Sequence, residues 1–176
     1  MEAVAHAGSV YLEAFEGSAE RAPQWLQSLH EQGIRAFEAR GFPGAREEAW
    51  RKTNLKPITA EYFPVAGTQG AASAELVERL GELGECFRVV FVDGRFAADL
   101  SDLAGLPSGV SVAPLSEYQS QAPERLVKSL GARADITGHP FAALNTAFFV
   151  DGAYIHVARG TGLEKPIVVT HIATAE

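Results

Sequence analysis

The sequence predicts an α+β fold with an N-terminal helical region, a small α/β part and a C-terminal β part. Apolar residues recur at helical spacing up to Phe37, which is typical of amphipathic helices. Asp93-Gly94 separates two short apolar runs, as in a β-hairpin. Apolar and polar residues alternate between Ala153 and Ala158, which indicates a strand.

The composition is that of an ordinary globular protein and restricts the possible partners. The net charge is −7, from 15 basic and 22 acidic residues, which argues against nucleic acid, because its binders need clustered cations. No run approaches the ~20 apolar residues of a membrane helix. The residues before Gly17 include glutamates and no Lys or Arg, whereas a signal peptide begins with a positively charged segment. We therefore expect a cytoplasmic protein with no nucleic-acid and no membrane partner.

The local cations and the single cysteine suggest no site. Glu47 and Glu48 interrupt the basic run between Arg46 and Lys56, so a solvated helix face is the favoured interpretation. Cys86 excludes an internal disulfide and a Cys-rich zinc or cluster site built by this chain alone. We expect it to be a small buried apolar residue, although a reactive thiol in an electropositive setting is the alternative.

Two helices are expected at the N-terminus. In residues 2–15, Ala7, Tyr11 and Phe15 fall on one face. The second helix should begin near Pro23, which suits a first turn, and end before Gly41. Its apolar stripe consists of Leu26, Leu29, Gly33 and Phe37, flanked by Trp25 and Ile34. Two such stripes predict a helical hairpin.

The middle of the chain is less regular. We expect a short helix at 45–52, an extended connector at 53–63 and a loop at 65–73. Ser73 is a suitable cap for a helix running to Leu80, with Leu76, Val77 and Leu80 facing inward. Strands are expected at 87–92, 95–98 and 110–113, the first two joined by Asp93-Gly94 with both residues at positive φ. Helical segments should follow at 115–119, 123–130 and 141–148.

Two strands are expected at the C-terminal end, at 153–158 and 166–173. Ile155 and Val157 share one face of the first strand, and Tyr154 and His156 share the other. An isolated pair of strands is marginal in water, so we expect either another chain or the rest of a longer protein to complete them. An unpaired edge near Ala173 would favour aggregation or a homodimer.

Two motifs carry a resemblance. The first is Glu48-Ala-Trp-Arg-Lys-Thr-Asn-Leu55, followed by Pro57 and Phe63-Pro64. The second runs from Pro140-Phe-Ala-Ala-Leu-Asn-Thr-Ala-Phe148 through Asp151-Gly152 and Gly160 to Glu164-Lys-Pro-Ile167. The ordered set resembles the start of SufB/SufD proteins, and the Glu-Lys-Pro-Ile ending resembles SufD more than SufB. The motif residues are Trp50, Arg51, Asn54, Leu144, Asn145, Thr146, Asp151, Gly152, Gly160 and Pro166.

The resemblance implies a fold and a role. Residues 1–138 would form the N-terminal helical and small α/β domain, and residues 139–176 the first rungs of a right-handed parallel β-helix. Ile155, Val157, Ile167 and Val169 suit its core, Gly152, Gly160 and Gly162 suit its corners, and Asn145 and Thr146 would bond backbone where the helical part meets the first rung.

In this family the SufD subunit pairs with SufB and contacts the SufC ATPase. The resemblance implies a non-enzymatic scaffold of iron–sulfur cluster assembly. This chain would bind no cofactor itself, because the parent complex handles the cluster and ATP. The residues implicated in cluster building belong to regions absent from this sequence.

The remaining residues offer little independent chemistry. The histidines are His6, His30, His139, His156 and His171. If His156 and His171 lie on neighbouring rungs they would approach each other, but no third ligand has suitable spacing, so we favour surface or core-edge histidines over a metal pair. No G-x-S-x-G or Walker motif occurs. The alternatives are a small β-solenoid enzyme using His156 or His171 and a free-standing module that recruits a partner strand.

Overall fold

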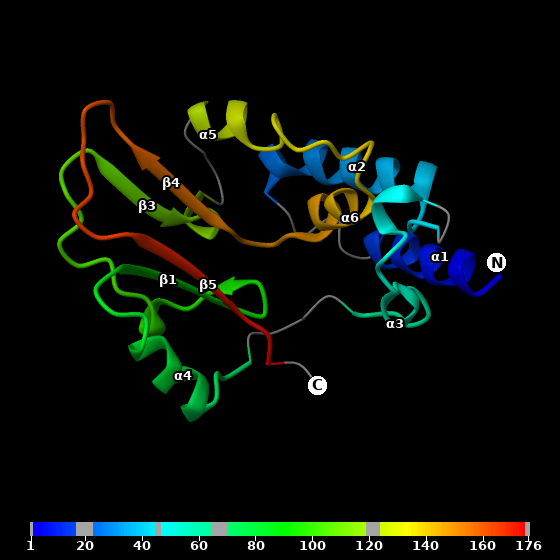
Figure 1. The fold of residues 1–176 in the computed structure, drawn as a ribbon. Helices are drawn as coiled ribbons and strands as arrows, with labels where there is room; N and C mark the ends of the chain where they lie inside the picture. The colour runs from blue at the N-terminus through cyan, green and yellow to red at the C-terminus, as the bar shows by residue number, and fades with distance from the viewer. Residues whose placement is uncertain (1, 17–22, 45–46, 65–69, 119–123, 175–176) are drawn as a thin grey trace. The chain divides into compact units, whose positions relative to one another are not determined.

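The computed structural model describes residues 2–16, 23–44, 47–64, 70–118 and 124–174 (Figure 1). The chain forms two compact units, each built from two segments: residues 1–65 with 120–149, and residues 66–119 with 150–176. We call them unit 1 and unit 2. The predicted domain division between 138 and 139 falls inside unit 1, just before a helix that packs within that unit.

Unit 1 is helical. It contains α1 (Glu2–Glu16), α2 (Gln24–Arg40), the 3₁₀ turn η2 (Glu48–Trp50), α3 (Lys56–Thr59), α5 (Glu124–Ser129) and α6 (Pro140–Phe148). The predicted helices at 2–15, near Pro23 and at 141–148 are confirmed. Gly41 ends α2 with φ +67°, a conformation that glycine adopts without strain, and its N–H bonds the Phe37 carbonyl at 2.6 Å.

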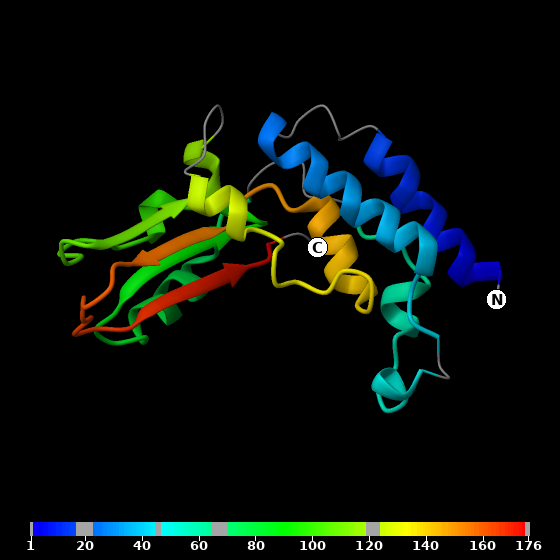
Figure 2. The same ribbon diagram turned by 90° about the horizontal axis from the view of Figure 1, so that it is seen from above.

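Helices α1 and α6 both pack on α2 (Figure 2). The α1 contact confirms the predicted pairing of the first two helices, with the Tyr11 ring edge-on to Phe37 at 6.2 Å. The larger contact is with α6, because Gly33 lets the backbones meet: a Cβ there would lie 2.6 Å from the Ala147 nitrogen. The buried core residues are Tyr11, Ile34, Phe37, Phe42, Ala143 and Ala147.

Two predictions for the connector between the helices need correction. Residues 53–63 are not wholly extended, because residues 56–59 form α3, whose Lys56 N–H is capped by the Asn54 Oδ1 at 3.2 Å. The helix expected at 45–52 is reduced in the described part of that range to η2. The loop expected at 65–73 and the ends at Gln119 and Pro123 lie partly or wholly outside the described residues.

Unit 2 combines strands with short helices. It contains α4 (Ala74–Gly81), β1 (Phe87–Val92), β2 (Arg95–Phe96), η3 (Ala98–Leu100), β3 (Val110–Pro114), η4 (Leu115–Tyr118), β4 (Ala153–Val157) and β5 (Ile167–Ile172). The predicted α+β class is confirmed. The Ser73 hydroxyl accepts a hydrogen bond from the Leu76 N–H at 3.3 Å, which confirms the predicted cap. Val77 was wrongly expected to face inward; it is exposed, while Leu80 is buried.

The Asp93-Gly94 turn is confirmed. Asp93 has φ 49° and Gly94 φ 75°, and β1 pairs antiparallel with β2. The second strand of this hairpin is shorter than expected, because η3 begins at Ala98.

The last two strands form, but the expectation that they lack partners in this chain is wrong. Strand β5 pairs in parallel with β1, and β4 pairs antiparallel with β3, so the sheets have the orders β2-β1-β5 and β3-β4. Leu80, Val90, Val92, Ala97 and Ile172 form a buried core around β1 and β5. Strands β4 and β5 do not pair with each other, and the described residues form no closed sheet or solenoid. The β-helix stays a prediction.

Candidate functional site

The first motif anchors the segment after α2 in unit 1. The Trp50 ring lies 5.2 Å from the Phe141 ring, so it joins η2 to α6. Arg51 is exposed and pairs with Glu48 at 3.3 Å. Asn54 starts α3 through the cap described above. Trp50 therefore contributes packing and Asn54 binds local backbone, whereas Arg51 lies at the surface.

The second motif places Leu144, Asn145 and Thr146 in α6. Leu144 packs against the unit 1 core, and Thr146 is buried. The Thr146 hydroxyl donates to the Ala142 carbonyl at 2.7 Å, one turn earlier in the same helix. The Asn145 backbone carbonyl accepts from the Phe149 N–H at 2.9 Å. The Thr146 bond therefore lies inside α6 and does not reach a strand, contrary to expectation.

Asp151 ties three backbone segments of unit 2 together. Its Oδ1 accepts from the Ser116 N–H at 3.0 Å and from the Gly152 N–H at 2.8 Å, and its Oδ2 accepts from the Phe96 N–H at 3.1 Å. The Gly152 carbonyl accepts from the Leu115 N–H at 2.8 Å. The start of β4 is thereby joined to β2 and to the β3–η4 junction.

A second aspartate that precedes a glycine has a parallel role. The Asp93 carboxylate accepts from the Gly70 N–H at 2.9 Å and from the Thr174 N–H at 2.8 Å, and the Thr174 hydroxyl also donates to it. It links the segment before α4 with the segment after β5. Sequence reasoning identified Asp93 as a turn residue only; the partners of its carboxylate are far away in sequence and gave no signal.

The remaining motif residues shape β5 and the loop before it. Gly160 has φ +81°, as a corner requires, whereas Gly152 and Gly162 are outside the left-handed region. The Pro166 carbonyl accepts from the Phe87 N–H at 2.9 Å and so sets the register of β5 on β1. The predicted site residues are thus split between unit 1 and unit 2.

The described histidines and the cysteine bring no metal site together. His156 lies on β4 and His171 on β5, so the two are not on paired strands; His171 stacks on Phe91 at 5.1 Å. Among the described residues no group of three His, Cys, Asp or Glu side chains is placed to hold a metal ion. His139 precedes α6, and its carbonyl caps the Ala143 N–H at 3.0 Å. Cys86 is free and half-buried, less buried than expected.

Among the described histidines of unit 1, His30 is the one that is buried. Its ring meets Phe149 edge-on at 4.8 Å, and its Nε2 has no hydrogen-bond partner among the described residues. Burial lowers the pKa of His30 below its usual value, because the charged ring would lose its hydration. The ring is therefore a neutral packing element at pH 7.

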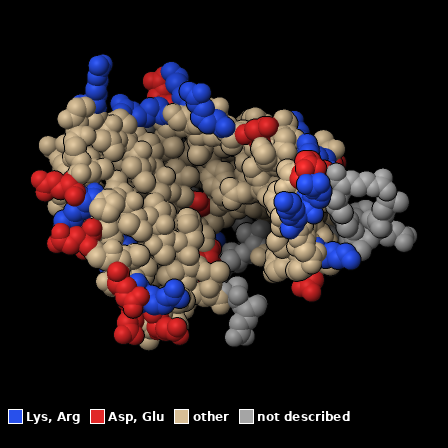
Figure 3. Space-filling view, viewed as in Figure 1, with Lys and Arg blue, Asp and Glu red and all other residues tan. Residues whose placement is uncertain are grey.

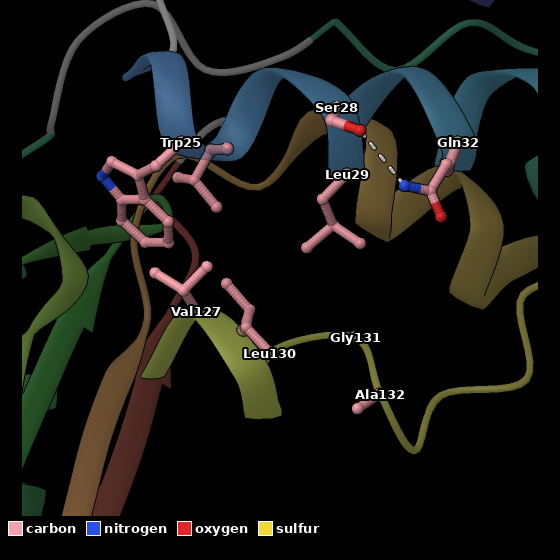
Figure 4. A pocket seen from close by; sticks show the side chains of 9 residues that line it. Trp25, Ser28, Leu29, Gln32, Val127, Leu130, Gly131 and Ala132 are labelled. Atoms are coloured by element: carbon pink, nitrogen blue, oxygen red, sulfur yellow. Dashed lines mark hydrogen bonds between the residues drawn. The ribbon is translucent and has the colours of Figure 1, made fainter. Parts of the chain in front are cut away.

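A pocket of about 300 Å³ lies in unit 1 between α2 and the segment that contains α5 (Figure 4). Trp25, Leu29, Val127 and Leu130 point toward it, and Ser28 and Gln32 form a hydrogen bond of 3.3 Å at its rim. The described residues that line it include no Asp, Glu, Lys, Arg, His or Cys. The pocket therefore offers an apolar wall but no general acid or base. Sequence reasoning assigned Trp25 and Leu29 to a packing stripe and missed this hollow.

None of the helices in the described ranges is both long enough and apolar enough to span a membrane. The family model for the SufBD protein N-terminal region matches residues 8–169. An iron–sulfur cluster assembly SufBD family protein of Synechocystis is 30% identical over 125 residues, which are 71% of this chain. The chain covers only 27% of that relative's length. By the extent of this match, the chain belongs to the SufBD family and corresponds to its N-terminal region.

Proposed function

We propose that this chain is the N-terminal part of a SufD-type scaffold subunit of iron–sulfur cluster assembly. The observation that carries the proposal is the family match over residues 8–169, together with a relative named for cluster assembly. The Glu164-Lys-Pro-Ile167 ending favours SufD over SufB. The proposed partners are a SufB-like subunit and a SufC-like ATPase.

A role as a scaffold and not as an enzyme is supported by what the motif residues do. Asp151, Asn54 and Pro166 bond main-chain groups, and Trp50 packs on Phe141. The part of the pocket lining that the structure describes has no acid, base or thiol side chain. We propose that the cluster and ATP are handled elsewhere in the parent complex, and that the protein is cytoplasmic.

The predicted β-helix remains part of the proposal. Ile155, Val157 and Val169 are exposed on β4 and β5, and a further layer of strands would bury such side chains. The parallel pairing of β5 with β1 is the pairing that stacked rungs use. Within the described ranges β5 is an edge strand of its sheet, and an edge strand is also what the alternative of a strand-recruiting module requires.

Co-expression of the full-length protein with SufB-like and SufC-like subunits tests the proposal. We expect one complex that contains all three proteins in size-exclusion chromatography, and iron–sulfur absorption after reconstitution. An unrelated β-solenoid protein of similar size, expressed with the same two subunits, is the control. If neither subunit associates with the protein under cluster-forming conditions, the proposed function is wrong.

A further inference from the structure

The pocket between α2 and the α5 segment of unit 1 has two anchored walls (Figure 4). Leu26 of α2 is 3% exposed and Leu126 of α5 is 5% exposed, so each helix is held by a buried leucine. Two residues of the lining come together, because a Cβ on Gly131 would lie 2.6 Å from the Leu29 Cδ1. The hollow of about 300 Å³ therefore lies between fixed elements, as in a preformed ligand site.

The apolar part of the lining fits a single ring. The four apolar side chains that point toward the hollow are Trp25, Leu29, Val127 and Leu130. Val127 is 45% exposed, although it follows the buried Leu126. An indole and branched aliphatic side chains favour a flat apolar group, and about 300 Å³ is the lower end of the range for small-molecule sites. A ligand of one ring with one substituent matches this space.

A polar pair at the rim defines what the substituent does. The Gln32 Nε2 donates to the Ser28 Oγ at 3.3 Å, and these two side chains make no other hydrogen bond within the described ranges. The Ser28 hydroxyl proton and the Gln32 Oε1 therefore stay available, one as a donor and the other as an acceptor. A carboxamide pairs with both, because it carries an N–H donor and a carbonyl acceptor.

The charges near the pocket lie outside the part of its lining that the structure describes. On α2 Arg35 pairs with Glu31 at 3.0 Å, and on α5 Lys128 pairs with Glu124 at 2.6 Å. Figure 3 shows Lys or Arg side chains next to Asp or Glu side chains over the α5 part of the chain. Two further exposed cations of this segment also stay outside the described lining: Arg125 and Arg133. The lining offers no counter-charge, so a neutral ligand suits it better than an ionic one.

We propose that this pocket binds a small neutral molecule made of one planar ring and a carboxamide-like group. The ring packs on the four apolar side chains, and the polar group pairs with Ser28 and Gln32. The proposal rests on the geometry of unit 1 alone, so it stands or falls independently of the scaffold role.

An NMR titration of the isotope-labelled 176-residue chain with benzamide tests the proposal. Trp25 lines the pocket whereas Trp50 packs on Phe141, so the Trp50 indole N–H is an internal control. We expect saturable shifts of the Trp25 indole N–H and the Gln32 side-chain amide, with a dissociation constant on the order of 1 mM. The Trp50 signal should stay in place.

Charged analogues and a serine variant test the polar group. At neutral pH benzoate has no donor and benzylammonium has no acceptor, so each should bind about three- to tenfold more weakly than benzamide. S28A should weaken benzamide binding by a similar factor. S129A is the matched control, because Ser129 is exposed on α5 outside the described lining, and it should leave the affinity unchanged. Equal binding of all three compounds overturns the assignment of a neutral carboxamide.

V127W tests the hollow itself. The larger side chain should fill it and weaken benzamide binding at least about tenfold, while the exposed position lets the fold persist. V77W is the matched control, since Val77 is 42% exposed on α4 of unit 2 and should not affect binding. The absence of a saturable Trp25 shift up to ~50 mM benzamide overturns the proposal. So do equal shifts of Trp25 and Trp50, or an affinity that V127W leaves unchanged.

Discussion

The Asp151 carboxylate accepts the Phe96 N–H at 3.1 Å across 55 residues of sequence. The same carboxylate also accepts from Ser116 and Gly152. A single side chain therefore holds the start of β4 against two segments that lie 35 and 55 residues earlier in the sequence.

D151A should destabilise unit 2 by about 2–4 kcal/mol, because three backbone N–H groups lose their acceptor. D151N should lose less, since one carbonyl oxygen remains. Urea denaturation followed by circular dichroism measures the change. D99A, at an exposed aspartate, is the control and should be neutral within about 0.5 kcal/mol. Equal stability of D151A and D99A would contradict the role given to Asp151.

G33A should destabilise unit 1 by about 2–3 kcal/mol, because the new Cβ would meet backbone atoms of α6 at 2.6 Å. The same substitution at Gly8 in α1 meets nothing within 4 Å and should stabilise the chain by up to about 1 kcal/mol through helix propensity. Thermal unfolding of the two variants gives the comparison. Shifts of the same sign would show that α2 and α6 are not in close contact.

His30 should make unit 1 less stable in mild acid. Burial holds the folded-state pKa below the usual value, whereas the unfolded chain takes up the proton near pH 6.5. The unfolded state therefore binds more protons as the pH falls through about 6.5, and the free energy of unfolding decreases until the folded-state pKa is reached.

Denaturant unfolding of wild type and H30F between about pH 7.5 and pH 5 measures this effect. H30F keeps a ring against Phe149 and should flatten the pH dependence. H139Q, which removes an exposed histidine, should leave it intact. An unchanged slope in H30F would mean that another group is responsible.

D93N tests the second aspartate link. Asn tolerates positive φ, so the turn should persist, but one carboxylate oxygen is lost and the end of the chain after β5 should loosen. We expect a loss of about 1–2 kcal/mol. Hydrogen exchange should show faster exchange of the Thr174 amide than in wild type. An unchanged Thr174 rate would contradict the link.

The sequence predicted most helices and strands because their signals are local. The Asp93-Gly94 turn, the Ser73 cap and the stop at Gly41 depend on neighbouring residues only. The partner of β5 was not predicted, because alternation identifies the face of a strand but not the strand beside it. Val77 was misplaced for a related reason: one helical turn does not show how wide the buried face is.

The candidate site was predicted less well than the fold. The motif residues lie in or beside folded elements, but Asp151 and Asp93 also bond groups that lie 23 to 81 residues away. The pocket near Trp25 requires α5 to lie beside α2, which no local pattern indicates. The expected closeness of His156 and His171 assumed that their strands pair with each other, and they pair with β3 and β1 instead.

The partnership of β1 with β5 imposes an order on biosynthesis. The ribosome releases Phe87–Val92 long before Ile167–Ile172, and the whole second segment of unit 1 is made in between. During translation the apolar strand β1 therefore stays without its partner β5 until residue 172 has been made. Slow codons or a bound chaperone in that interval would act on β1 and also on β3, whose partner β4 is likewise made later.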